Sequence, residues 1–523
     1  MSDINTPFSA VQIYLAKRRW KLNLALLTVL VLTLLGLAAV IVAITLAFEL
    51  GGSKTPKYAA DPQHFMHASI GAEANSGLPY WMWKALPKLF PAEFKGRDDY
   101  KAFGFLYETD ANGNESDLPV GISKRQVYGV DVVWFNCATC HVGTWRTAAG
   151  GPQHITPGMG SNNFNLYAFI QFLLAAGADE RLSPDTMIPA MKQAGAHFNP
   201  IQEAFLRYAV LPQVREGLVE RRSRLGPLLD AQPAWGPGRV DTFNPYKLLL
   251  QLPPGSHVPD AELVGTTEFP AIFDQRPREG MQLHWDGNNN SLAERNLSAA
   301  IGAGVTAASV DHPAIDRDAA WLMDLKPPAS PYHPDPAAVA RGQAIYMQGC
   351  ASCHGWQGAN GYVFQGAALG KVDPIAQVGT DPNRLNSYTQ GFRDWQVSAL
   401  FAGTPYHFTH FVKTDGYANL PLDGLWLRAP YLHNGSVPTL ADLLAPPAER
   451  PKSFLRGSDV IDPVKGGFVA PPCPVGPAST GAAPADGFCF DTAQRGNGAQ
   501  GHAYGTDLPA AQKADLLAYL LTF

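Results

Sequence analysis

Two short segments with the same spacing, CATCH at residues 137–141 and CASCH at residues 350–354, constrain the fold of this chain more than any other feature. In each segment two cysteines stand three positions apart and a histidine follows directly. Cysteines at this spacing can reach the two vinyl groups of one haem, and the adjacent histidine is then placed to bind the iron. The sequence therefore predicts two covalently attached c-type haems, one at each segment.

The predicted attachment residues are Cys137, Cys140, Cys350 and Cys353, and the predicted proximal iron ligands are His141 and His354. Two other interpretations of a C-x-x-C pair fit the sequence less well. A four-ligand zinc site needs two further ligands at recognisable spacing, whereas each segment here supplies its own histidine. A thioredoxin-type dithiol does not require the histidine and occurs in a βαβ context that the sequence lacks.

An uncharged, apolar stretch at residues 24–48 follows a short basic segment that contains Lys17, Arg18, Arg19 and Lys21. At about 1.5 Å per residue the stretch can span a hydrocarbon layer of about 30 Å. A cleaved signal peptide is the alternative, but its apolar region has about 7–15 residues and ends at a small-residue cleavage site. Because basic residues stay on the cytoplasmic side, we expect a single-pass anchor in a bacterial inner membrane, with the haem domains in the periplasm.

The chain is long enough for more than one domain, and its hydrophobic pattern suggests where the boundaries lie. We expect a cytoplasmic tail at residues 1–21, a transmembrane anchor at 22–50, a first haem domain with a helical insertion at 51–325, and a second, cytochrome c-like haem domain at 333–523. The second domain has a helical stretch that leads into CASCH, and a last helix on which Leu516, Leu517 and Leu520 share one face. The predicted fold class is mainly α, with two cytochrome c-like haem domains and long irregular loops, preceded by one transmembrane helix.

The remaining two of the six cysteines, Cys473 and Cys489, flank a loop rich in Pro, Gly and Ala. An exported protein meets an oxidising compartment, so we expect a disulfide between them. The formal net charge of −5 provides no basic surface for nucleic acid, which is therefore not an expected partner.

If the C-terminal haem takes its second axial ligand from the part of its own domain that follows CASCH, that ligand is not a methionine, because no methionine follows Met347. Four histidines remain there besides His354: His407, His410, His433 and His502. We expect His502 to be the distal ligand, because it lies in a glycine-rich loop just before the last helix. His433 is expected to bind a haem propionate or to be structural, and the other two are expected to be buried histidines bonded to backbone.

For the first haem the local distal candidates are His154 and Met159, in the segment GGPQHITPGMG. Either residue could equally be a loop residue that faces solvent. If neither binds, the iron has an open face, and chemistry would take place there.

Longer segments resemble known diheme proteins. The segment QLHWDGNNNSLAERNLSAAIG resembles the W-D-G…S-L-x-E-Q segment of bacterial diheme cytochrome c peroxidases, and LDGLWLRAPYLHNGSVPTLADLL resembles their A-P-Y-x-H-x-G-S segment. The segments WGPGRVDTF, YLHNGSVPTL and NGAQGHAYGTDLPAAQKADLLAYL resemble rubber oxygenase A-like diheme proteins, to which the chain is most similar. The resemblance extends over most of the chain from about residue 120 onward.

The resemblance implies that Glu294 is the distal acid/base of the first haem and that Trp285 lies near the interface of the haem domains as an electron relay. A positioned carboxylate can move a proton between the two oxygens of a peroxide, typically for a gain of about 10²–10⁴ in rate. The alternatives are that Glu294 pairs with Arg295 or forms a capping box with Ser291, and that Trp285 is a core residue. The missing methionine departs from the peroxidases and fits the rubber oxygenase-like branch, with His502 as ligand.

The sequence thus predicts a membrane-anchored periplasmic diheme oxidoreductase, a reductive peroxidase in which the first haem activates peroxide and the second transfers electrons. A dioxygenase that cleaves an apolar organic substrate and a non-catalytic electron-transfer cytochrome are the alternatives. Expected partners are membrane lipid, a small redox protein or quinol-linked electron donor, and peroxide or dioxygen. Calcium is a further candidate cofactor at DGNNNS, although this segment lacks the central Gly of an EF-hand and has Leu297 at its Glu position.

Overall fold

The computed structural model describes residues 6–50, 55–250, 257–473 and 487–523. The chain divides into two compact units. One consists of Met1–Lys54 with Gln126–Asp131, and the other of Thr55–Arg125 with Val132–Phe523.

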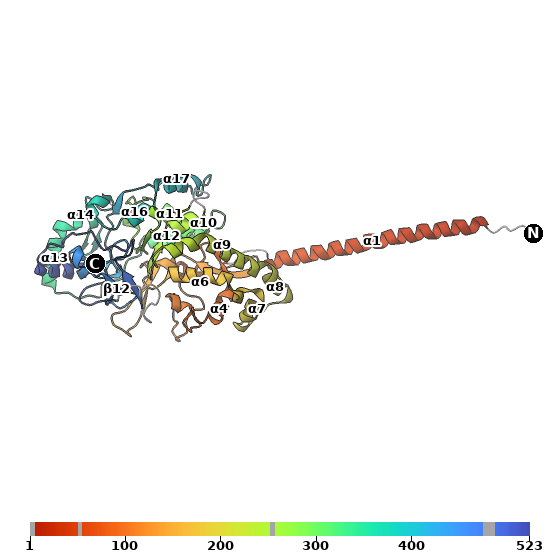
Figure 1. Ribbon diagram of the computed structural model, residues 1–523, viewed down its shortest axis with the longest axis horizontal. Helices are drawn as coiled ribbons and strands as arrows, with labels where there is room; N and C mark the ends of the chain where they lie inside the picture. Colours follow the sequence, from red (N-terminus) through yellow and green to blue (C-terminus); the bar gives the residue numbers. More distant parts are fainter. Residues whose placement is uncertain (1–5, 51–54, 251–256, 474–486) are drawn as a thin grey trace, which may run out of the picture. The chain divides into compact units, whose positions relative to one another are not determined.

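The first unit is dominated by one helix, α1 (Thr6–Leu50) (Figure 1). Its segment Lys17–Val42 has a mean hydropathy of 2.9 and no buried residue. Among the described residues α1 alone is long and apolar enough to cross a membrane, although an N-terminal signal sequence would have the same properties. Large apolar side chains such as Leu30 and Leu35 are exposed along it, as expected of a helix whose solvent is lipid.

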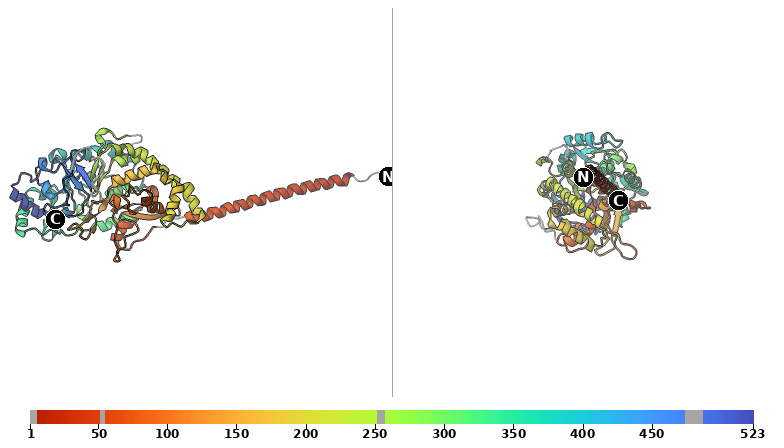
Figure 2. Two further views of the ribbon diagram at one scale, coloured as in Figure 1. Left: turned by 60° about the horizontal axis from the view of Figure 1, so that its bottom comes forward. Right: turned by 90° about the vertical axis from the view of Figure 1, so that its right-hand side faces the viewer.

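The second unit is built from helices joined by long loops. Its helices of ten residues or more are α4 (Tyr80–Leu89), α6 (Leu166–Ala178), α7 (Pro184–Gln193), α9 (Leu211–Ala231), α11 (Leu292–Gly302), α12 (His312–Leu322), α13 (Pro336–Gly349), α17 (Gln390–Ala399) and α19 (Ala510–Leu520). Its shorter helices are α2 (Asp61–His67), α3 (Glu73–Ser76), α5 (Ala138–His141), α8 (Pro200–Phe205), α10 (Asn244–Leu249), α14 (Ala351–His354), α15 (Ile375–Val378), α16 (Asn383–Ser387) and α18 (Leu440–Leu443). Figures 1 and 2 show α6 and α9, in yellow tones, side by side.

The strands form one three-stranded sheet, in the order β1-β3-β2, and several two-stranded sheets. The first comprises β1 (Leu78–Pro79), β2 (Ile122–Val127) and β3 (Val130–Phe135). The antiparallel pairs are β4 (Val142–Trp145) with β5 (His154–Pro157), β6 (Arg239–Asp241) with β7 (Thr266–Glu268), β8 (Trp356–Gly358) with β9 (Gly361–Val363), β10 (Val372–Pro374) with β11 (Gly416–Ala418), and β12 (Ser453–Arg456) with β13 (Phe488–Asp491). Helices make up 43% of the residues, so the expectation of a mainly α fold is confirmed only in part.

Two hydrophobic clusters form most of the core. The larger one is rich in aromatic rings, among them Trp83 stacked on Tyr100 with ring centroids 3.7 Å apart. It also takes in Phe392 and Phe408, which lie in the part of the sequence assigned to the second haem domain. The second cluster gathers around Trp426 and the C-terminal helix.

Helices α13 and α19 pack closely and frame the CASCH segment, which α13 leads into. They approach most closely at Gly342, where a Cβ atom would lie 1.9 Å from the backbone oxygen of Asp515. The guanidinium of Arg341 also pairs with the carboxylate of Asp515, at 2.7 Å. The expected pairing of a first and a last helix is therefore present around the second segment.

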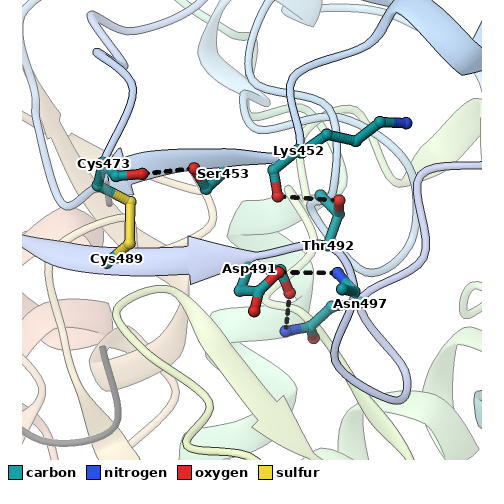
Figure 3. Close-up of a disulfide and its surroundings, with 8 residues drawn as sticks. Lys452, Ser453, Cys473, Cys489, Asp491, Thr492 and Asn497 are labelled. Atoms are coloured by element: carbon teal, nitrogen blue, oxygen red, sulfur yellow. Dashed lines mark hydrogen bonds between the residues drawn. A yellow bond between two sulfur atoms is a disulfide. The ribbon is translucent and has the colours of Figure 1, made fainter. Parts of the chain in front are cut away.

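A disulfide joins Cys473 to Cys489, with the Cα atoms 5.8 Å apart (Figure 3). Cys489 lies on β13, which pairs with β12. The hydroxyl of Ser453, on β12, donates to the backbone oxygen of Cys473 at 2.6 Å. The two cysteines are 16 positions apart, and closing a loop of about 15 residues stabilises a fold by about 3 kcal/mol in the chain-entropy account. The bridge therefore adds to the stability of the β12–β13 pair.

Candidate functional site

The first C-x-x-C-H segment forms the short helix α5 directly after β3. Asn136 fixes the turn between them, since its side chain accepts from the N–H of Ala138 at 3.0 Å and donates to the backbone oxygen of Ala68 at 2.9 Å. Thr139 donates through its hydroxyl to the backbone oxygen of Gly121, at 2.6 Å. Gly121 has a φ of +87°, and a Cβ atom there would lie 2.4 Å from the nitrogen of Thr139, so only glycine fits.

The two proximal histidines are held in the same way. His141 donates from Nδ1 to the backbone oxygen of Pro270 at 3.0 Å, and His354 donates from Nδ1 to that of Leu420 at 2.8 Å. Burial lowers the pKa of both rings, that of His141 to about 4, although the hydrogen bonds oppose this shift. Both imidazoles are therefore neutral at pH 7, with the Nε2 lone pair available to a metal, as in a typical iron-binding histidine.

The four cysteines of the two segments are unbridged. Burial raises their thiol pKa values, to about 12 for Cys140 and about 11 for Cys350. A thiol with such a pKa is protonated at neutral pH. Within the described ranges no group of three or more His, Cys, Asp or Glu side chains is placed to hold a metal ion.

A cavity of about 690 Å³ opens at the first segment and is called the first cavity below. Cys137, Cys140 and His141 all line it. Its walls are largely apolar side chains of α6, α9, α10 and α11, and a few cationic groups such as Arg278 and Arg295 also line it. An apolar cavity with thiols, an imidazole and cationic side chains on its wall fits a porphyrin attached at Cys137 and Cys140.

His354, in the second C-x-x-C-H segment, faces the side chain of another histidine, His502. The rings of His354 and His502 have centroids 6.3 Å apart and planes inclined by 47°. A metal–nitrogen bond is about 2 Å long and the ring centroid lies about 1 Å beyond it, so two imidazoles on one iron have centroids about 6 Å apart. Nδ1 of His502 is buried without a hydrogen-bond partner in the described part of the chain. This pair therefore fits an iron bound between two histidines.

The loop that carries His502 is fixed by Arg450. Its guanidinium donates to the backbone oxygens of Ala499, Gly501 and His502, at 2.7, 2.8 and 3.1 Å. The N–H of His502 donates to the backbone oxygen of Val378 at 2.8 Å. Burial, with smaller contributions from His354 and Arg450, lowers the pKa of the His502 ring to about 4, which keeps it neutral at pH 7.

The three other histidines considered for the second haem have partners within the protein. His433 is buried, bonds through Nε2 to the hydroxyl of Tyr417 at 2.9 Å, and stacks on that ring. Nε2 of His407 donates to the backbone oxygen of Val397, as expected of a histidine satisfied by backbone. His410, in contrast, has a side chain that is 52% exposed and bonds to Glu294, so the expectation of a buried histidine is wrong there.

Glu294 is not among the described residues that line the first cavity. Its carboxylate accepts from the N–H groups of Thr409 and His410 at 2.7 and 3.0 Å, and lies 2.7 Å from Nδ1 of His410. One half of the capping box is present, because the N–H of Glu294 donates to Oγ of Ser291 at 3.3 Å. The other half is absent, since the N–H of Ser291 donates instead to Asn289.

The three other residues named for the first haem lie in different surroundings, and Met159 is buried and not among the described residues that line the first cavity. Trp285 lines the first cavity and donates from Nε1 to the backbone oxygen of Glu268 at 3.0 Å. His154 is exposed on β5 and stacks on Trp145, with ring centroids 4.1 Å apart. His154 is not among the described residues that line the first cavity.

The polar groups of DGNNNS bind other parts of the protein. The carboxylate of Asp286 pairs with Arg384 at 2.8 Å, and both side chains are buried. Asn288 bonds to His284, and Asn289 donates to Glu294. The calcium site therefore stays a prediction that these contacts do not favour.

The sequence reasoning missed His284. It lines the first cavity together with His141, and its Nδ1 lies 2.6 Å from Oδ1 of Asn288. Its place directly before Trp285, in a segment already singled out, was the only available signal, because no spacing rule marks such a residue.

Two protein families match parts of the chain. The family described as RoxA-like, cytochrome c-like matches residues 416–455, and the cytochrome c family matches residues 339–400. The first match covers the segment with Leu420 and His433, and the second covers CASCH. These matches support a c-type cytochrome of RoxA-like character, with covalently bound haem c.

Two proteins of Sinorhizobium fredii (strain NBRC 101917 / NGR234) are similar over shorter regions. The uncharacterized protein y4iM is 32% identical over 234 residues, which are 40% of this chain and 51% of that protein. The uncharacterized protein y4iJ is 41% identical over 115 residues, which are 20% of this chain and 17% of that protein. The chain thus matches about half the length of the first relative and less of the second.

Proposed function

We propose that this chain is a membrane-anchored diheme oxidoreductase that reduces peroxide at the first haem and transfers electrons through the second. The contrast between the two candidate sites supports the proposal. His354 is faced by a second imidazole, an arrangement typical of electron transfer, whereas His141 lies at a cavity of about 690 Å³. An iron with a free face can react with a small molecule.

When bound, haem c supplies iron that can bind oxygen species and change its oxidation state. The protein's part is to hold and surround it. Pro270 and Leu420 fix the orientation of the proximal imidazoles through their backbone oxygens. The apolar wall of the first cavity excludes bulk water, which strengthens every polar interaction inside it. Reduction of one HOOH to two waters takes two electrons and two protons.

A dioxygenase that cleaves an apolar organic molecule is the second candidate. Aliphatic side chains of α6 and α9 line one side of the first cavity, namely Leu173, Leu174, Leu218, Leu225 and Leu229. Such a wall suits an apolar substrate, and the RoxA-like match is consistent with this reaction class. The two functions share the open iron and differ in the molecule that fills the cavity.

Electron paramagnetic resonance of the purified full-length holoprotein tests the proposal. The protein is measured fully oxidised and then with one electron added per molecule. We expect a high-spin ferric signal from one haem, abolished by cyanide, together with a low-spin signal from the other. Peroxide consumption with a reduced electron donor, and dioxygen uptake with an apolar alkene, then separate the two reactions. Low-spin signals from both haems in both states would contradict an open site and leave an electron-transfer cytochrome.

A further inference from the structure

We propose that His284, oriented by Asn288 and assisted by Arg295, is the acid–base group of the first cavity. The inference rests on the proposed reaction with peroxide and assigns its proton transfer to named residues. It differs from the expectation drawn from family resemblance, which places Glu294 in this role.

The backbone around His284 is held in an uncommon conformation. His284 has a φ of +63°, in the left-handed region that residues with a Cβ rarely adopt. The N–H of Leu283 donates to the backbone oxygen of Asn289 at 2.6 Å, and the buried ion pair of Asp286 with Arg384 fixes the same turn. Backbone outliers that several contacts maintain are concentrated at functional sites.

The hydrogen bond to Asn288 determines which ring nitrogen is basic. Oδ1 of Asn288 is a carbonyl oxygen and can only accept, so Nδ1 of His284 carries the hydrogen. Nε2 is then the nitrogen with the lone pair. It has no hydrogen-bond partner among the described residues, and the side chain lines the first cavity. Burial lowers the pKa of this ring to about 4, against the smaller effects of Asp286 and Asn288. The imidazole is therefore a neutral base at pH 7.

Arg295 provides a positive charge on the same cavity. Its guanidinium donates to Oδ1 of Asn296 at 2.9 Å and forms no ion pair with a described acidic side chain. A cation without a carboxylate partner favours an anion in the space that it faces. It can thus stabilise negative charge that develops on an oxygen when the proton leaves.

The proton balance of the step is simple. Nε2 of His284 accepts the proton of one oxygen of HOOH and returns it to the other oxygen, which leaves as water when the O–O bond breaks. His284 ends the step neutral, so it consumes no net proton. The remaining oxygen becomes the second water, because it takes up two electrons from the external donor, through the haems, and two protons from solvent.

Glu294 is poorly placed for this task. Its carboxylate oxygens already accept hydrogen bonds from Thr409, His410 and Asn289. It is not among the described residues that line the first cavity, whereas Arg295 and His284 are.

The experiment uses the full-length holoprotein and the variants His284→Leu, His284→Gln, Arg295→Leu and Glu294→Gln, with the exposed His197→Gln as control. One readout is the association rate of cyanide with the ferric first haem, because HCN must lose its proton to bind. The other is the rate of the first spectral change with peroxide. Haem content and the spectrum of the second haem report whether each variant is intact, and His284→Gln serves if His284→Leu does not fold.

We expect both His284 variants to slow both reactions by about 10²–10⁴, the usual contribution of a general base. Arg295→Leu should slow the peroxide reaction and weaken fluoride binding, and His197→Gln should match the wild type. Wild-type rates in the His284 variants, with slow rates in Glu294→Gln, would overturn the inference and leave the proposed function intact.

Two further outcomes are distinguishable. If neither the wild type nor any variant binds cyanide or reacts with peroxide, the proposed function itself fails. If the wild type is inert but His284→Leu gains a high-spin signal and binds cyanide, His284 is an iron ligand that closes the site. That result would overturn its acid–base role.

Discussion

At the scale of single residues, the histidines of this chain have different roles because their partners differ. His141 and His354 each donate from Nδ1 to a backbone oxygen, which leaves Nε2 for a metal. His284 is bonded through Nδ1 to a side-chain carbonyl and lines a cavity, and His433 bonds through Nε2 to the hydroxyl of Tyr417. The residue type alone does not distinguish these roles, but the atom that each ring nitrogen meets does.

Replacement of His502 by methionine should raise the midpoint potential of the second haem. An axial methionine gives a haem a higher midpoint potential than an axial histidine does. Axial ligands together span roughly 0.8 V, and we expect this one exchange to raise the midpoint potential by on the order of 0.1 V. A redox titration followed at the haem absorption bands measures it, with His410→Met, at a largely exposed site of the same half, as control. Equal potentials in wild type and His502→Met would mean that His502 does not bind the iron.

At the scale of elements, α11 is connected to the loop at residues 409–410 through one carboxylate. Burial alone would raise the pKa of Glu294, but its bonds to His410, to the N–H groups of Thr409 and His410, and to Asn289 together lower it. The charged form is therefore stabilised in the folded state. The contacts of Glu294 therefore join α11 to the loop at residues 409–410 and do not place its carboxylate in the first cavity.

Glu294→Gln should lower the free energy of unfolding by about 1.5–3 kcal/mol at pH 7, the usual range for hydrogen bonds to a charged group. Since the folded pKa lies below the unfolded value, this stabilisation is complete above the unfolded pKa of about 4.3 and is lost as the pH falls through the folded pKa. Denaturant unfolding of both proteins at pH 7 and at pH 3–4 tests this, and the difference should shrink at the lower pH. An equal difference at both pH values would show that ionisation of Glu294 is not involved.

At the scale of the whole molecule, the two halves of the sequence do not make two separate cores. Phe392, Phe408 and Phe411 follow the second haem segment in sequence but pack in the cluster that surrounds the first. Conversely, Met159 and Phe273 pack in the cluster of the C-terminal helix. Each cluster thus takes side chains from both sides of residues 325–333, where the sequence analysis divides the chain.

The N-terminal helix should make the full-length chain an integral membrane protein. We expect it to stay in the membrane fraction during alkaline carbonate extraction with residues 1–50 still attached, as N-terminal sequencing can verify. Replacing Leu30 and Leu35 by lysine costs roughly 2.5–3.5 kcal/mol for each central charge and should reduce insertion, whereas alanine at both positions should not. Recovery of a soluble chain that begins after the helix would instead identify a cleaved signal sequence.

The sequence by itself determined what depends on local chemistry. The two C-x-x-C-H segments, the apolar N-terminal helix and the missing methionine after Met347 can all be read from residues close together in the chain. Cys473 and Cys489 were the one remaining pair, and the structure joins them. Short-range patterns of this kind are readable because spacing along the chain fixes which groups can meet.

Only the tertiary structure decided which distant residues face each other. It brought His502 to 6.3 Å from His354, across almost 150 positions, and turned Glu294 toward Thr409 and His410. It also placed His284 on the cavity of His141, which no sequence pattern indicated. Such contacts arise from the packing of loops against a shared core, and packing depends on the whole chain, whereas propensity and spacing are local properties.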